Sequence, residues 1–145
     1  MNVKHILERK GSAVTTIPTN ATIGEAARTL AEARIGAIVV SDDGSTINGI
    51  LSERDIVRVI GTDGPGALTR PVTEAMTANV ITCKPDDRIN VLMSMMTQRR
   101  IRHLPVAENG KMTGLISIGD VVKERMDEIE SDAAAMRDYI TGMTA

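Results

Sequence analysis

Two short segments of the chain carry the residue types and spacing that could do chemistry. Segment 49–55 reads Gly-Ile-Leu-Ser-Glu-Arg-Asp, and segment 114–120 reads Gly-Leu-Ile-Ser-Ile-Gly-Asp, so one pattern returns 65 positions later. In each segment the serine precedes the aspartate by three positions, which is the spacing of a capping box at a helix start. Capping of free backbone N–H groups would by itself explain each copy.

The setting of both segments also suits a bound anion. Each serine stands where an apolar strand passes into a predicted helix, and free N–H groups at a helix start attract negative charge. An earlier strand in each half carries a threonine, Thr16 in the first half and Thr82 in the second. A carboxylate there can accept hydrogen bonds from two ribose hydroxyls, while N–H groups and basic side chains bind phosphate. Two interpretations therefore stay open, helix capping and a nucleotide site.

The elements that must position these residues occur twice in the same order. The first half predicts a helix over 1–10, a strand over 13–17, a helix from Thr22 to Gly36, strands over 37–40 and 47–51, and a helix opened by Ser52. Glycine-rich segment 61–66 should end that helix and divide the halves. The second half predicts helical turns over 72–76, a strand over 80–83, a helix capped by Asp87, strands over 104–106 and 112–116, and a helix capped by Ser117.

Equivalent residues of the two halves lie 65 or 66 positions apart, as Val14 with Val80 and Gly44 with Gly110. This spacing indicates an internal duplication, and neither half alone would bury much surface, so we expect the halves to pack on each other. The predicted fold class is α/β (α+β), with two β-α-β-β-α repeats in pseudo-twofold arrangement. The predicted divisions are a first repeat over 1–60, a linker over 61–71, a second repeat over 72–126 and a helical tail over 127–145.

The tail carries an apolar seam. Its residues alternate spacings of four and three, as the a and d positions of a coiled coil do: Val122, Met126, Ile129, Ala133, Met136 and Ile140. Such a seam needs a partner surface, and the sequence leaves two open, the core of its own chain and a dimer interface.

Composition excludes several classes of partner. The 145 residues carry a net charge of -2 with no basic stripe, no Phe or Trp and one Tyr, so nucleic acid is not an expected partner. No apolar run approaches the ~20 residues of a membrane helix, so a membrane is not expected either. Cys83 is the single cysteine, which indicates a reducing compartment, and we expect a cytoplasmic location. With His5 and His103 as the only histidines, no metal site is predicted.

The two halves resemble a tandem pair of CBS domains, the module named after cystathionine β-synthase. The matching motifs in the second half are Val-Ile-Thr at 80–82, Ile-Arg-His-Leu-Pro-Val at 101–106 and the repeated segment 114–120. The first half matches at 14–16, 35–40 and 49–55. The resemblance covers residues 3 to about 125. It implies a regulatory module, as in stand-alone bacterial-type CBS proteins, that binds AMP, ATP or NAD between the repeats.

The resemblance also implies the residues of two clefts, each combining parts of both repeats. One cleft would use Ser52, Arg54 and Asp55 with Thr82, Arg102, His103 and Leu104. The other would use Ser117, Gly119 and Asp120 with Thr16, Gly36, Ala37 and Ile38. Because Gly36-Ala37 stands where the second half has Arg102-His103, we expect the Asp55 cleft to hold phosphate more tightly and the Asp120 cleft to differ. Arg99-Arg100 reads as a solvated helix end rather than a binding patch.

The predicted function is that of a homodimeric sensor. It binds an adenine nucleotide, needs no cofactor, and acts on a separate effector protein that the sequence does not identify. The alternatives are a ligand-independent dimerisation or scaffold module, in which both Ser-x-x-Asp segments only cap helices, and an enzyme that acts on a nucleotide. Against an enzyme, the sequence shows no paired carboxylates, activated nucleophile or metal constellation.

Overall fold

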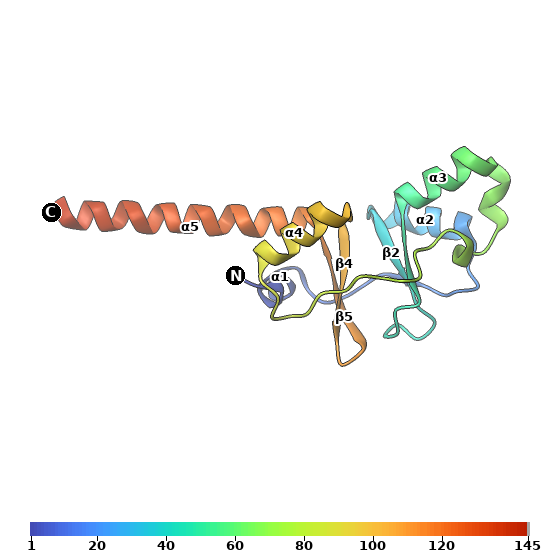
Figure 1. The fold of residues 1–145 in the computed structure, drawn as a ribbon, viewed down its shortest axis with the longest axis horizontal. Helices are drawn as coiled ribbons and strands as arrows, with labels where there is room; N and C mark the ends of the chain where they lie inside the picture. Colours follow the sequence, from blue (N-terminus) through green and yellow to red (C-terminus); the bar gives the residue numbers. More distant parts are fainter. Residues whose placement is uncertain (145) are drawn as a thin grey trace.

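The computed structural model describes residues 1–144 as two small α/β halves followed by a long helix (Figure 1). The elements in chain order are α1 (Val3–Lys10), β1 (Thr16–Ile17), α2 (Ile23–Ala33), β2 (Ala37–Val40), β3 (Gly49–Ser52), α3 (Glu53–Asp63), 3-10 helices η1 (Pro65–Thr69) and η2 (Val72–Glu74), α4 (Ile89–Arg99), β4 (His103–Glu108), β5 (Lys111–Ser117) and α5 (Ile118–Thr144). The predicted mixed class, the repeated halves and the C-terminal helical extension are confirmed.

Each half has its own sheet. The first is three-stranded in the order β1-β2-β3, with β1 parallel and β3 antiparallel to the central β2. All four residues of β2 are buried, as the apolar run at 37–40 predicts for a strand covered on both faces. The second sheet has only β4 and β5, which pair antiparallel with an irregularity at Val106/Ala107.

The strand predicted over 80–83 is wrong as a regular strand. Only Cys83 pairs with β4: its N–H donates to Pro105 O at 3.0 Å and its carbonyl accepts from Ala107 N at 2.9 Å. In a parallel ladder the next bond on one side needs an N–H at Pro105, and on the other side an N–H at Pro85. Proline has none, so the ladder stops after one residue. In the first half Val39 stands at the place of Pro105, and β1 pairs over two residues.

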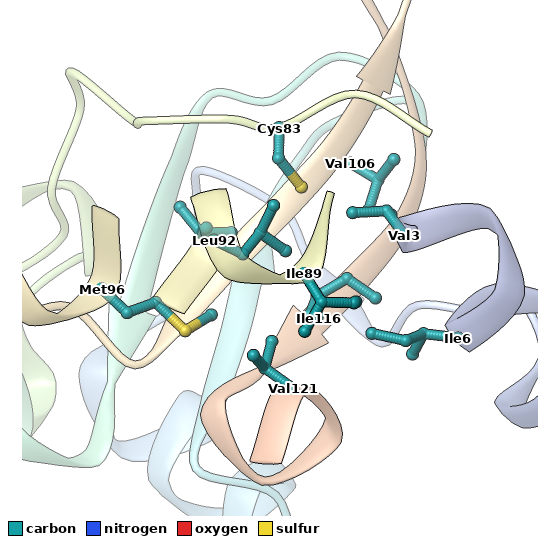
Figure 2. Close-up of a cluster of buried hydrophobic side chains, with 10 residues drawn as sticks. Val3, Ile6, Cys83, Ile89, Leu92, Met96, Val106, Ile116 and Val121 are labelled. Atoms are coloured by element: carbon teal, nitrogen blue, oxygen red, sulfur yellow. The ribbon is translucent and has the colours of Figure 1, made fainter. Parts of the chain in front are cut away.

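The two halves are interlocked because each begins with a segment that packs into the core of the other. Figure 2 shows Val3 and Ile6 of α1 in the core of the second half, together with residues such as Leu92 and Ile116. Val72 of η2 lies in the core of the first half in the corresponding way. Residues 1–10, which the sequence places with the first repeat, thus complete the core of the second half.

The glycine that opens each repeated segment permits this exchange. A Cβ on Gly114 would lie 2.6 Å from Leu7 of α1, and a Cβ on Gly49 would overlap the Met76 side chain. A side chain at either position would push the exchanged segment out of its groove. The glycines at 49 and 114 are therefore packing requirements, which the repeated pattern alone does not reveal.

Helix starts follow the predicted capping boxes, except at α4, and the end of α3 also differs from the prediction. Thr22 with Glu25 and Ser52 with Asp55 form reciprocal caps. The N-cap of α4 is Arg88 rather than Asp87, whose carboxylate instead accepts from Lys84 N. Segment 61–66 does not end α3 at Gly61: the helix continues to Asp63 and stops at Gly64, whose φ of 83° suits glycine. One unfavourable glycine near a helix end costs only about 1 kcal/mol, and the backbone bonds outweigh it.

We expect Gly114→Ala to lower the free energy of unfolding by about 1–3 kcal/mol, because the new methyl group must displace Leu7 from the second core. Gly61→Ala is a matched control, since nothing lies within 4 Å of its Cβ position, and it should raise stability by about 0.5–1 kcal/mol. Chemical denaturation of both variants measures the difference. Equal stability of the two variants would contradict the close packing at Gly114.

Candidate functional site

A cleft of about 280 Å³ lies between the halves at the first repeated segment. Its walls come from the start of α3, the edge of β2 and the segment that joins α4 to β4. It is lined by Gly36, Ala37, Ile50, Ser52, Glu53, Arg54, Asp55, Arg58, Thr77, Arg100, Ile101, Arg102 and His103. We call it the Asp55 cleft.

The capping box leaves half of the Asp55 carboxylate available. Oδ2 of Asp55 accepts from Ser52 N at 2.8 Å and from Ser52 Oγ at 3.0 Å. Oδ1 has a 3.4 Å contact with the exposed guanidinium of Arg58. The helix thus fixes the carboxylate through one oxygen, while the other can accept a hydrogen bond from a ligand hydroxyl. Capping and ligand binding, which the sequence offers as alternatives, are compatible at this residue.

Basic side chains dominate the walls of the Asp55 cleft. The lining includes two carboxylates, those of Glu53 and Asp55, and four arginines: Arg54 and Arg58 on α3, and Arg100 and Arg102 between α4 and β4. Arg100 is the C-cap of α4 in a left-handed conformation, with φ of 54°, and this turn brings it to the cleft wall. Arg100 is thus an exposed helix end, as predicted, but it also lines the cleft, which the prediction did not include. This excess of positive charge suits an anion such as phosphate.

His103 stands between this cleft and a second one, lining both. It lies against β2 because residue 36 is glycine: a Cβ there would come within 3.3 Å of the imidazole Cε1. Burial lowers the pKa of His103 below its ordinary value of 6.5, and the opposing effect of Glu53 does not cancel it. The imidazole is therefore neutral at pH 7, with one nitrogen able to donate and the other to accept.

The second cleft, of about 420 Å³, lies at the second repeated segment and is lined by Lys10, Ala13, Val14, Thr15, Arg34, Ile35, Gly36, Ala37, His103, Leu115 and Ser117. The side chain of Lys10 determines whether the carboxylate beside this cleft is available to a ligand. The Nζ of Lys10 donates to Asp120 Oδ2 at 2.7 Å and to Leu115 O at 2.9 Å. The carboxylate equivalent to Asp55 is thus bound by a lysine of the same chain.

The two carboxylates therefore differ in their surroundings. Burial acts to raise the pKa of Asp120, but hydrogen bonds from Lys10 and Ser117 outweigh it and keep the pKa below the usual value. No lysine is among the residues that line the Asp55 cleft. A ribose entering the second cleft would have to compete with an ammonium group already in place.

The structure brings together most but not all residues named from the sequence. Ser52, Arg54, Asp55, Arg102 and His103 share the Asp55 cleft, whereas Thr82 is exposed and Leu104 is buried in the second core, and neither lines it. Ser117, Gly36 and Ala37 line the second cleft, with Asp120 behind Lys10. Thr16, Ile38 and Gly119 do not line it. Gly36 and Ala37 also line the Asp55 cleft, so these two residues belong to both.

In the Asp55 cleft the sequence did not point to four polar residues, Glu53, Arg58, Thr77 and Arg100, or to the apolar Ile50 and Ile101. In the second cleft the residues it did not point to include Lys10 and Arg34. One signal could have found the two C-caps. Arg34 and Arg100 lie 66 positions apart, both with φ of 54°, and each lines one cleft. The offset that relates the repeats therefore also relates these arginines.

Other chemistry is sparse in the described part of the chain. Within residues 1–144 no group of three or more His, Cys, Asp and Glu side chains is placed to hold a metal ion. Burial raises the pKa of the Cys83 thiol to about 12, so this cysteine is protonated at neutral pH and is a poor nucleophile.

Comparison with known families identifies the two halves. The sequence matches the CBS domain over residues 3–62 and again over 72–127. The chain belongs to the CBS domain family. The resemblance read from the motifs is confirmed, and the two CBS domains are the two interlocked halves.

Individual CBS proteins resemble this chain over most of its length. The crystal structure of the CBS-domain containing protein ATU1752 from Agrobacterium tumefaciens is 48% identical, with a TM-score of 0.83, covering 86% of this chain and 99% of that one. The CBS domain protein PAE2072 from Pyrobaculum aerophilum, solved in complex with AMP, is 30% identical with a TM-score of 0.73, covering 83% and 89%. These two structures share the arrangement of the CBS pair described here.

Some curated relatives are longer than this chain. The mitochondrial CBS domain-containing protein CBSX3 of Arabidopsis thaliana is 34% identical over 86% of this chain, which spans 62% of its length. The arabinose 5-phosphate isomerase GutQ of Salmonella typhi is also 34% identical, but this chain spans only 37% of it. Among the described helices of the CBS pair, none is both long and apolar enough to cross a membrane.

The lowered pKa of His103 predicts a pH dependence of stability. Because the unfolded chain binds this proton more readily, the contribution of neutral His103 is complete above pH 6.5 and is lost as the pH falls through the folded-state value. We expect the free energy of unfolding to decline between about pH 7.5 and about pH 5, and His103→Gln to reduce that decline. Chemical denaturation at both pH values measures it; an identical decline in both proteins would contradict the assignment.

Proposed function

We propose that this CBS pair is a non-catalytic sensor that binds one adenine nucleotide in the Asp55 cleft and transmits its presence to a separate effector protein. The observation that carries the proposal is that one cleft holds four arginines and a fixed carboxylate, that of Asp55, whose second oxygen has only a 3.4 Å contact with the exposed Arg58. The carboxylate suits ribose hydroxyls and the arginines suit phosphate. AMP is the first ligand to test, because PAE2072 was solved in complex with AMP; ATP and NAD are the other candidates.

The adenine ring has an apolar wall available. Ile50 and Ile101 line the Asp55 cleft from opposite halves, and Ala37 adds a small buried residue. A ring held between aliphatic side chains of both halves would contact both CBS domains at once. Binding would then change how firmly the halves hold each other, which is a physical route from ligand to effector.

The runner-up is a ligand-independent dimerisation or scaffold module. The reciprocal hydrogen bonds of Ser52 with Asp55 support it, because they satisfy the helix start without any ligand. The arginines of the Asp55 cleft have no role in that alternative. A scaffold would bind no nucleotide, so direct binding measurements separate the two. The cytoplasmic location and the absence of nucleic-acid and membrane partners stay predictions from the sequence.

Thermal melting with AMP, ATP, NAD and an adenine-free sugar phosphate tests the proposed function. A ligand present at 100 times its dissociation constant stabilises the folded chain by about 2.7 kcal/mol. We expect Asp55→Ala to weaken binding by roughly 1.5–3 kcal/mol, because it removes charge-assisted hydrogen bonds to the ribose. Asp43→Ala, which removes a carboxylate that bonds its own loop at Ser45 and Thr46, is a control outside the cleft. No shift with any adenine nucleotide would favour the scaffold.

Lys10 predicts how many nucleotides bind. With Asp120 held by Lys10, we expect calorimetry to give one nucleotide per chain, and Lys10→Met to raise this to two by releasing the second carboxylate. Lys4→Met, on the same helix but exposed and outside both clefts, should leave one. Combining Lys10→Met with Asp120→Ala should restore a single site. Two nucleotides bound to the unaltered chain would show that Lys10 does not close the second cleft.

We also propose that the sensor acts as a homodimer. The exposed apolar seam of α5 supports this, since such a face in a globular protein is normally covered by a partner. A dimer places two Asp55 clefts in one assembly, so that an effector contacts both.

A further inference from the structure

The seam on α5 does not pack against its own chain. Val122, Met126, Ile129, Met136 and Ile140 are 44–59% exposed, although they recur at the a and d spacing of a coiled coil. Figure 1 shows α5 continuing well beyond the two halves, with no other element beside its C-terminal part. The sequence left two partner surfaces open for this seam, the core of its own chain and a dimer interface. Within the described residues, the seam is not buried in the core of its own chain.

The opposite face of the same helix holds α5 to the body. Val121 is fully buried in the second core, and Glu124 is 1% exposed, with its carboxylate 3.2 Å from Arg9 of α1. Arg9 also binds Asp127 at 2.7 Å. These residues occupy the b, c and f positions when the seam is a and d, so the body lies behind the helix and the seam faces outward. A second helix can therefore lie along the seam without meeting the body of its own chain.

Charged residues beside the seam favour a second copy of α5 as the partner, in the parallel orientation. With Met126 and Ala133 at a, the g positions are Arg125 and Asp132, and the e positions five residues later are Glu130 and Arg137. In a parallel pair of helices each g residue faces the e residue five positions on in the other helix. Arg125 then faces the partner's Glu130, and Asp132 faces the partner's Arg137. Both contacts join opposite charges.

The antiparallel arrangement brings like charges together. Full overlap of the seam would place Met126 beside the partner's Met136, and the flanking residues follow from that register. Lys123 would then face the partner's Arg137, and Glu130 and Asp132 would each face their own equivalents. Every one of these contacts is repulsive, and e and g charges are what set orientation in coiled coils.

We propose that two copies of this chain join through α5 as a parallel, in-register two-stranded coiled coil. The proposal rests on the homodimer proposed above and adds its interface and direction. The apolar seam is confined to the a and d positions and charged residues occupy e and g positions beside it, which suits two strands. The groove along Gly119, Val122 and Met126 lies on this same face near the base of the helix.

The ion pair between Arg125 and Glu128, at 3.1 Å on one helix, does not oppose this interface. Exposed pairs of this kind contribute little, so Arg125 can turn to the partner's Glu130 at small cost. The exposed part of α5 also gains from pairing, because most of a helix's stability in proteins comes from packing its apolar face rather than from intrinsic propensity.

Disulfide trapping in the full chain tests the direction. Under mild oxidation Met136→Cys, at a d position, should give a covalent dimer, whereas Ser131→Cys, on the outer face, should not. Cys83 is 2% exposed and does not interfere. In the parallel pair, residues 126 and 136 of different chains lie about 15 Å apart. A mixed disulfide between Met126→Cys and Met136→Cys chains would overturn the parallel arrangement.

A charge exchange tests the facing pairs. Asp132→Lys and Arg137→Glu should each weaken dimerisation on the order of tenfold, since two attractive pairs per dimer become repulsive. The double variant should regain wild-type affinity because its pairs are reversed but opposite. A double variant as weak as either single variant would overturn the assigned contacts. Asp132→Lys also places Lys four residues after Glu128, which supports the isolated helix, so weakening would not reflect lost helicity.

Mass in solution separates this proposal from the ones it rests on. Sedimentation should show a dimer that Ile129→Asp converts to a monomer, with Ser131→Asp as the matched control that stays dimeric. If the Ile129→Asp variant is still a dimer, the proposed α5 interface is refuted, but the proposal of a homodimer is not. A monomeric wild-type chain at high concentration would refute both. None of these measurements requires a nucleotide. Failure of the proposed nucleotide binding would therefore be detected separately, in the binding experiments.

Discussion

The structure depends on an exchange of segments between its halves. Neither CBS domain completes its own core: α1 closes the second, and η2 closes the first. This exchange is possible only because Gly49 and Gly114 leave room for the arriving side chains. A ligand bound between the halves, as proposed, would contact both sides of one interlocked unit, and its binding would affect the stability of the whole unit rather than of one domain.

The same exchange makes the two clefts unequal. α1 ends in Arg9 and Lys10, and its position in the second core carries these cations to the base of α5. Lys10 neutralises the aspartate of one cleft, while Arg9 binds carboxylates of the helix that carries the apolar seam. The segment equivalent to α1 in the first half has no lysine at this place, so the Asp55 carboxylate keeps an oxygen for a ligand. Lys10 is therefore one of the differences between the copies that set the two clefts apart, together with Gly36-Ala37 in place of Arg102-His103.

Most helices and strands could be predicted from the sequence because the two repeats show the same patterns of residues at equivalent positions. The failures of prediction have local causes. The strand at 80–83 is lost because Pro85 and Pro105 interrupt the ladder, an effect that appears only when the pairing register is known. Arg100 is the solvated helix end that the sequence predicts, but its left-handed cap also brings it to the cleft wall. Thr82 and Leu104 carry the motif but lie outside the cleft walls, since a motif fixes residue identity and not the direction of a side chain.

By itself the sequence determined the family, the two repeats, the capping boxes and the apolar seam. Each of these follows from the local spacing of residues or from the offset of 65 or 66 positions between the repeats. Only the tertiary structure decided which residues meet. It placed Lys10 on Asp120 across a separation of 110 positions, gathered four arginines from both halves around Asp55, and turned the seam of α5 away from its own core. The physical reason is that long-range contacts depend on how the exchanged segments are oriented, and no local pattern records that orientation.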